Sequence, residues 1–217
     1  MLKDNIERVY QRIAASCARI DTDPDRITVV CVAKGRTAGQ ILEVINLGYK
    51  NIGENRVQEA LEKYKQISGA KWHMIGHLQS NKVKEAIKIF DLIHSVDSLS
   101  LAKEINKQAV KISKIQDILL EVKTSPEVTK FGLAPDEVEN VSREINKLSN
   151  IEIKGLMTIA PLADNMQEAR PYFSKLRQLR DKLNPEWLLS MGMSDDFEVA
   201  VEEGANIIRL GRAIFNV

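Results

Sequence analysis

The segment Ile-Thr-Val-Val-Cys-Val-Ala-Lys, residues 27–34, sets the first structural unit of this chain. Most of its residues are aliphatic and β-branched, a composition that predicts a buried strand. Its last residue, Lys34, would lie at the carboxyl end of that strand, where α/β folds place their chemistry. An amine that is partly desolvated there can act as a Schiff-base nucleophile. The alternative is that Lys34 is only the first solvated residue after the strand.

Strand-like and helix-like segments alternate along the rest of the chain. Eight strands are predicted, at residues 27–34, 51–55, 71–76, 92–96, 117–122, 151–159, 187–191 and 206–210. Helices are predicted at residues 4–19, 37–47, 56–66, 81–90, 98–111, 165–183 and 195–203, and another is opened by Pro135. Strict alternation implies parallel strands. Eight such units behind one leading helix predict a single (β/α)8 TIM-type barrel domain over residues 1–217, with the N-terminal helix covering the gap after strand eight.

The alternative fold is an open, doubly wound sheet. Such sheets usually have fewer strands, and this chain lacks the Gly-x-Gly-x-x-Gly turn after its first strand. The barrel is therefore the α/β fold that we expect.

The overall composition excludes several function classes. Lys and Arg total 31 and Asp and Glu total 30, for a net charge of +1, so we expect no dedicated surface for nucleic acid or an anionic membrane. No apolar segment is long enough for a transmembrane helix, and residues 1–5 lack the hydrophobic core of a signal peptide. The two cysteines, Cys17 and Cys31, imply no disulfide framework. We therefore expect a cytoplasmic protein.

Glycines and polar residues follow the last two predicted strands. Gly192 and Ser194 follow strand seven, and Gly211 and Arg212 follow strand eight. Barrels commonly bind phosphate at this place, because glycine lets backbone N–H groups converge on an anion, and Ser194 adds a hydroxyl donor. Ser194 or Asp195 would also cap the following helix, whose N-terminus favours a phosphate. The alternative is that the glycines only end the strands and that Ser194 is a plain helix cap.

The alternation of side chains along a strand indicates which of them face the barrel interior. If Lys34 faces inward, Val30 and Val32 do too, and they form an apolar floor. On strand eight, Arg209 shares a face with Gly211 and would point into the mouth of the barrel.

Two histidines in and just after the third predicted strand raise the question of a metal site. His73 and His77 are four residues apart, which on a strand separates them by roughly 13 Å. One ion cannot bridge that distance, so we expect no metal.

A Schiff-base lysine and a phosphate cradle at one barrel mouth together describe a site for pyridoxal 5′-phosphate (PLP). At this point the sequence resembles the PLP homeostasis proteins, also called PLP-binding proteins, which have the fold of the alanine racemase N-terminal domain. The resemblance covers nearly the whole chain. It is carried by VAK (32–34), GENRVQE (53–59), WHMIGHLQSNK (72–82), HSVD (94–97), KFG (130–132), GLMT (155–158), LSMGMSDD (189–196) and IRLGRAIF (208–215).

The resemblance implies roles for six residues of this chain. They are Lys34, which holds PLP, Asn55 beside the cofactor, Arg209 near the pyridine nitrogen, and Ser194, Gly211 and Arg212 at the phosphate. Two positions depart from the family pattern: the family often has Tyr at the place of Arg56 and usually Ser or Thr at the place of Arg212. The tail after Phe215 is also shorter than usual.

The resemblance implies a protein that buffers or delivers PLP inside the cell, with the cofactor held as a Schiff base on Lys34. The alternative is a PLP-dependent amino-acid racemase. Racemisation needs proton donors on both faces of the cofactor, and relatives take one from a second, β-rich domain that this sequence does not contain. An arginine at the pyridine nitrogen also weakens the ring as an electron sink. We therefore expect no robust catalytic activity, and we expect PLP-dependent client enzymes or amino acids as partners.

A third hypothesis applies without the family resemblance. It is a barrel enzyme that binds a sugar phosphate and uses Lys34 to form an imine with it. An absorbance band of PLP in the purified protein would separate this hypothesis from the other two.

Overall fold

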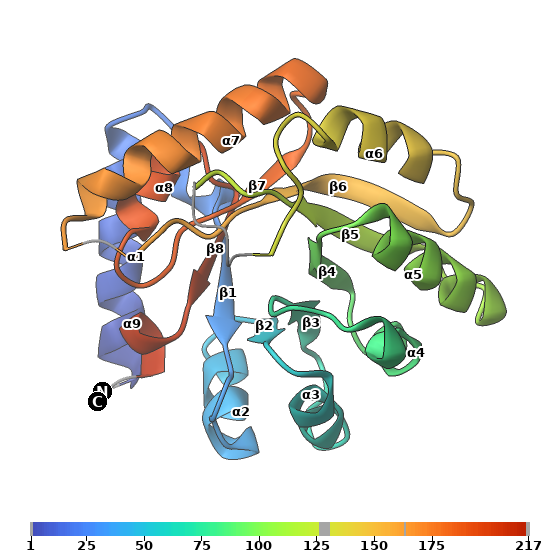
Figure 1. Cartoon of the computed structure of the whole chain (residues 1–217). Coiled ribbons are helices and arrows are strands. Elements are labelled where there is room, and N and C mark those ends of the chain that lie inside the picture. The colour runs from blue at the N-terminus through green and yellow to red at the C-terminus, as the bar shows by residue number, and fades with distance from the viewer. Residues whose placement is uncertain (1, 126–130, 163, 216–217) are drawn as a thin grey trace.

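Eight parallel strands close into a barrel in the computed structural model, which describes residues 2–125, 131–162 and 164–215 (Figure 1). Each strand pairs with the next, and β1 pairs with β8 to close the ring. The predicted barrel is therefore confirmed, and the open sheet is wrong. The strands are β1 (Thr28–Val32), β2 (Asn51–Glu54), β3 (Lys71–Met74), β4 (Leu92–Val96), β5 (Gln116–Glu121), β6 (Ile151–Met157), β7 (Leu188–Ser190) and β8 (Ile207–Leu210).

Helices surround the barrel on its outside. The α-helices are α1 (Leu2–Ala18), α2 (Ala38–Asn46), α3 (Val57–Tyr64), α4 (Val83–Ala86), α5 (Leu99–Lys111), α6 (Val138–Ile145), α7 (Arg170–Leu183), α8 (Phe197–Glu202) and α9 (Arg212–Phe215). Short 3-10 helices occur at η1 (Pro24–Arg26), η2 (Ser80–Lys82) and η3 (Met166–Ala169). None of the helices in the described ranges combines the length and apolar character that crossing a bilayer requires.

Most predicted helices differ from the observed ones by one to three residues at their ends, and the larger differences lie in the following segments. The helix expected to open at Pro135 begins at Val138. The helix expected from residue 165 starts as η3, and its α-helical part begins at Arg170, so Pro171 falls in the first turn, where its missing N–H costs nothing. The helix expected at residues 81–90 is split between η2, the short α4 and turns. The short α9 after β8 was not predicted.

The side chains inside the barrel form an apolar cluster separate from the core between barrel and helices. Its buried members come from six strands or strand ends: Val30, Ile75, Leu92, Leu119, Met157 and Ile207. Val32 packs against this cluster, so the prediction that Val30 and Val32 face inward is confirmed. Barrel interiors are packed in this way, which leaves the space for a ligand at the mouth.

The N-terminal helix α1 covers the barrel beside its last strand. In Figure 1 it runs alongside α8 and α9. The Asn5 side-chain amide donates to the Ile214 carbonyl oxygen at 2.9 Å, and Arg12 forms an ion pair with Glu198 at 2.7 Å. The predicted position of this helix, after strand eight, is therefore confirmed.

Candidate functional site

Lys34 lies on a turn beyond the carboxyl end of β1. The strand ends at Val32, two residues earlier than predicted, because Gly35 turns the chain with a φ of +68°, a value that favours glycine. The Lys34 side chain is exposed, not partly desolvated as predicted. Its ammonium forms no hydrogen bond or ion pair with any residue that the structure describes. The amine is therefore free to react or to bind an anion.

Two cavities meet at Lys34. The first, which we call the cradle cavity, has a volume of about 420 Å³ and lies at the ends of β1, β7 and β8. Its lining includes Lys34, Ser194, Arg209, Gly211 and Arg212. The second, which we call the cationic cavity, has a volume of about 470 Å³ and lies at the ends of β1, β2 and β3. Its lining includes Lys34, Asn55, Arg56, His77 and Lys82. Five of the six predicted site residues thus surround the cradle cavity, and Asn55 borders the other one.

A buried ion pair holds the backbone next to Lys34. The Ala33 N–H donates to the Gly53 carbonyl at 2.8 Å, and the Lys63 ammonium donates to the Ala33 carbonyl at 2.7 Å. Lys63 also pairs with the fully buried Glu54. Burial raises the pKa of Glu54, and the Lys63 ammonium opposes this. No local sequence pattern indicates this pair, because Lys63 lies on α3, far along the chain from Lys34.

The predicted phosphate cradle consists of backbone donors from two loops. Among the hydrogen bonds of the described residues, none uses the backbone N–H of Ser194, Gly211 or Arg212 as donor. The Ser194 hydroxyl oxygen accepts the Ala213 N–H at 3.1 Å, which ties the loop after β7 to the start of α9. Three residues whose N–H groups have no acceptor among the described residues, one of them carrying the Ser194 hydroxyl, therefore line the same cavity as Lys34. Free backbone donors around one cavity are typical of an anion site.

The predicted capping of α8 is wrong. This helix begins at Phe197 after Asp196, whose carboxylate accepts the Met193 N–H at 2.6 Å. Ser194 instead bonds to Ala213, as described above, and Asp195 forms an ion pair with Arg212. Parallel β7 and β8 bring these loops together, and local sequence does not show that contact. The Arg212 guanidinium is thus already paired with a carboxylate and adds little net charge to the cradle.

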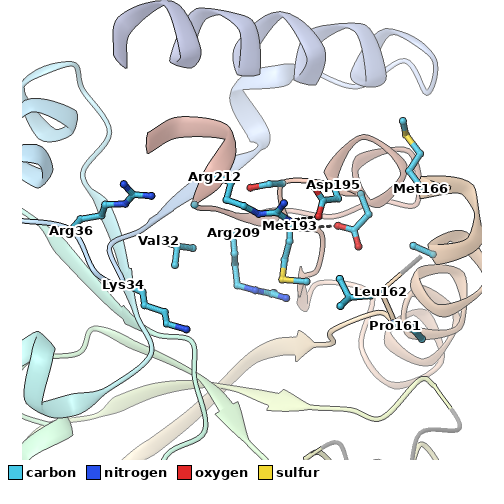
Figure 2. A pocket seen from close by; sticks show the side chains of 14 residues that line it. Val32, Lys34, Arg36, Pro161, Leu162, Met166, Met193, Asp195, Arg209 and Arg212 are labelled. Atoms are coloured by element: carbon cyan, nitrogen blue, oxygen red, sulfur yellow. Dashed lines mark hydrogen bonds and ion pairs between the residues drawn. The ribbon is translucent and has the colours of Figure 1, made fainter. Parts of the chain in front are cut away.

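Arg209 is buried on β8, and its guanidinium is held by two acceptors. It donates to the Ser190 hydroxyl oxygen at 2.6 Å and to the Thr158 carbonyl at 2.9 Å. Burial lowers the pKa of Arg209 to about 10, and the charges of Asp196 and Glu121 oppose this. Arg209 is therefore still a cation at neutral pH. Figure 2 shows Lys34 and Arg209 extending into the cradle cavity from β1 and β8.

A chain of hydrogen bonds continues from Arg209 through the barrel interior. Ser190 Oγ lies 2.9 Å from His94 Nδ1, His94 Nε2 lies 2.9 Å from His73 Nδ1, and His73 Nε2 lies 3.1 Å from Asn51 Oδ1. Because the guanidinium can only donate, the Ser190 hydroxyl donates onward to His94. Each neutral imidazole then donates to the next group, and the chain ends on the Asn51 oxygen.

Burial keeps both of these imidazoles neutral. It lowers the pKa of His73 to about 4 and that of His94 well below its ordinary value. In the sequence His73 stands four residues from His77, but in the structure its hydrogen-bond partner is His94. No cluster of three or more potential metal ligands occurs within the described ranges.

Asn55 carries a buried amide atom without a partner. Its side-chain oxygen is buried and forms no hydrogen bond, while its backbone N–H donates to Glu54 at 3.3 Å. An unpaired buried polar atom costs free energy unless a ligand satisfies it. Asn55 therefore fits a ligand that lies beside Lys34.

Comparisons with known proteins identify the family to which this chain belongs. The family model described as alanine racemase, N-terminal domain, matches residues 2–217. A pyridoxal phosphate homeostasis protein of Aquifex aeolicus is 43% identical over 98% of this chain and 96% of its own length. The chain belongs to the pyridoxal phosphate homeostasis protein family. Another relative with that name, from Pseudomonas aeruginosa, is 34% identical over 99% of this chain and 94% of its own length.

Solved structures agree with the fold of this family member. PipY of Synechococcus elongatus with PLP bound is 34% identical, with a TM-score of 0.82 over 96% of this chain and 100% of that one. A protein of Bifidobacterium adolescentis is also 34% identical, with a TM-score of 0.90 over 99% and 94% of the two chains. An alanine racemase of Clostridium difficile is 17% identical with a TM-score of 0.76, and the match spans 56% of that chain. This last likeness shows the fold alone.

Proposed function

We propose that this protein binds PLP in the cradle cavity and serves PLP homeostasis inside the cell, by buffering or delivery. The observation that carries the proposal is that one cavity is lined by Lys34, by the Ser194 hydroxyl and by three residues whose N–H groups have no acceptor among the described residues. A ligand with an aldehyde at one end and a phosphate at the other matches this pair of features, the amine for the aldehyde and the donors for the phosphate. The names of the relatives and the PLP bound to PipY support the same ligand.

The residues of the cavity fit PLP group by group. Lys34 supplies an exposed amine that can bind the aldehyde covalently as a Schiff base. The loops at Ser194, Gly211 and Arg212 supply donors for the phosphate. Arg209 lies between these ends and faces the ring nitrogen in this proposal. When bound, PLP supplies an electrophilic carbonyl carbon and an electron-withdrawing ring.

The site favours holding the cofactor over catalysis. Arg209 stays protonated at neutral pH, with a pKa of about 10, so it donates to the ring nitrogen and leaves that nitrogen without a proton of its own. An unprotonated ring stabilises a carbanion poorly. We therefore propose that the protein has no robust turnover, and that PLP-dependent enzymes and free amino acids exchange the cofactor with it.

Borohydride reduction followed by peptide mass mapping tests the attachment. The purified protein should show a PLP absorbance band, and reduction should fix the added mass on the peptide that contains Lys34. A label on Lys82, the other lysine of the cationic cavity, would contradict the assignment.

A racemase is the second candidate, because the fold is that of alanine racemase. Exchange of the α-hydrogen of alanine in D₂O separates the two functions. We expect slow or absent exchange. Several turnovers per second that disappear in Lys34→Ala would establish the racemase instead.

A further inference from the structure

The cationic cavity lies on the other side of Lys34 from the proposed PLP site. Its lining carries the basic side chains of Lys34, Arg56, His77 and Lys82, and no Asp or Glu of the described residues lines it. A cavity lined by one sign of charge attracts the opposite sign. Its volume of about 470 Å³ lies in the range of small-molecule sites.

Two of these four basic groups have no partner among the residues that the structure describes. His77 faces Asp97 at 3.3 Å, and Arg56 faces Glu59 at 3.7 Å. The ammonium groups of Lys34 and Lys82 form no ion pair or hydrogen bond with any residue in the described ranges. Among the described residues, the two lysine ammonium groups therefore bring positive charge to this cavity that no carboxylate pairs with.

Neutral donors border the same space. The helix α3 begins at Val57 without any side-chain cap on its first turn, and Val57 and Gln58 line the cavity. First-turn N–H groups have no partner within their helix and favour an anion. The side-chain amide of Asn55 lines the cavity too, and its NH2 group can donate to an anion, whereas its oxygen only accepts.

The shared position of Lys34 decides which anion the cavity receives. An amine that takes the place of Lys34 on the aldehyde carbon of PLP must lie where the Lys34 nitrogen lies, at the border of both cavities. The cradle cavity is then filled by the ring and the phosphate. The cationic cavity is then the space that remains for the rest of the incoming amine.

We infer that the cationic cavity binds the carboxylate of an amino acid whose amino group exchanges with Lys34. This inference rests on the proposed function, because it needs PLP in the cradle cavity. In the exchange, the incoming amine forms the bond to the aldehyde carbon that the lysine gives up, and Lys34 leaves as a free amine. No oxidant or reductant is needed. Arg56, at which the family often has Tyr, makes this cavity more basic in this chain.

The test compares two stable, reduced adducts on protein from which PLP has been removed. One is N-(5′-phosphopyridoxyl)-L-alanine, and the other is the matching alaninamide, which has the same shape without the charge. Calorimetry should give a dissociation constant at least about tenfold lower for the alanine adduct, the size expected of a charge-assisted hydrogen bond. The double variant Arg56→Gln, Lys82→Gln should bind both adducts equally.

Controls separate this inference from the proposed function. Lys84→Gln removes an exposed charge from α4 outside the cavity lining, and it should keep the preference. Equal binding of the two adducts by the unaltered protein, or a preference that survives in the double variant, would overturn the inference alone. If neither adduct binds and borohydride fixes no label on Lys34, the proposed function fails with it.

Discussion

The cradle cavity and the cationic cavity share Lys34 but are built in opposite ways. In the cradle cavity, hydrogen bonds within the protein fix the side chains. Arg209 is buried and donates to Ser190 and Thr158, and the Ser194 hydroxyl accepts from Ala213. In the cationic cavity the Arg56 side chain is 74% exposed and Lys82 is unpaired within the described residues. A preorganised site binds one rigid ligand without an ordering cost, whereas exposed side chains must be ordered by each ligand. The difference suits a fixed cofactor on one side and varied amines on the other.

The largest expected effect is at the residue that the two cavities share. Lys34→Ala should abolish borohydride-fixed labelling by PLP, because the exposed amine is the proposed attachment point. Weak binding through the phosphate should remain, since the donors of the cradle do not depend on Lys34. The matched variant Lys82→Ala should label fully, measured by intact-protein mass. Equal labelling of both variants would remove the distinction between the two lysines.

The next effect compares the two arginines, one from each cavity. Arg209→Met should lower the free energy of unfolding by roughly 2–6 kcal/mol, because its two buried acceptors lose their donor and each costs about 1–3 kcal/mol. Arg56→Met, on the exposed side, should change it by no more than about 0.5 kcal/mol. Urea denaturation measures both. Similar losses for the two variants would show that the cradle is no more preorganised than its neighbour.

A single hydroxyl tests the phosphate end of the cradle. Ser194→Ala removes one donor to a charged group, a loss of about 1.5–3 kcal/mol, or roughly tenfold to hundredfold in the affinity for PLP. Pyridoxal, which lacks the phosphate, should bind equally to Ser194→Ala and to the unaltered protein. Equilibrium dialysis provides the measurement. A pyridoxal affinity that falls as much as the PLP affinity would place Ser194 away from the phosphate.

The sequence predicted the barrel because a barrel depends on local patterns. A short run of β-branched residues indicates each strand, and strict alternation of strands with helices is compatible with few α/β folds. Strand alternation also indicated the inward face of Val30 and Val32. The phosphate site at the loops after β7 and β8 stays a prediction. All of these are statements about neighbours in the chain.

What the sequence did not predict are contacts between strands far apart in the chain. Ser194 bonds to Ala213 where a helix cap was expected, and His73 pairs with His94 on β4, not with His77, which lies beyond the end of β3. Lys34 is more exposed than its strand suggested, since β1 ends before it. Such contacts depend on the register between neighbouring strands, which local sequence patterns do not predict.

The neutral imidazoles behind Arg209 predict an acid sensitivity on the cradle side. His73 has a folded-state pKa of about 4, below its ordinary 6.5, so between these values the unfolded chain binds a proton that the folded protein does not. The titration of His73 therefore leaves the free energy of unfolding almost unchanged at pH 7 and lowers it as the pH decreases. At pH 5 the free energy of unfolding should be about 2 kcal/mol lower than at pH 7. In His73→Gln this part of the slope should be missing from urea denaturation curves at the two pH values. An unchanged slope would mean that His73 is protonated in the folded barrel.

The smallest effect concerns Arg212, at which the family usually has Ser or Thr. Its guanidinium pairs with Asp195 on the surface, and exposed pairs contribute only about 0–1 kcal/mol. Arg212→Ser removes this pair and places a hydroxyl among the cradle donors, so the affinity for PLP should rise by less than about tenfold.

The control variant Asp195→Asn breaks the same pair without adding the hydroxyl and leaves the guanidinium charge unbalanced. If the pair matters because it neutralises Arg212, Asp195→Asn should tighten PLP binding through the charge, and this gain should disappear at high salt, whereas the gain of Arg212→Ser should persist. A loss of affinity in Arg212→Ser would instead make the guanidinium itself a phosphate ligand, and the cradle would then depend on an exposed side chain, as the cationic cavity does.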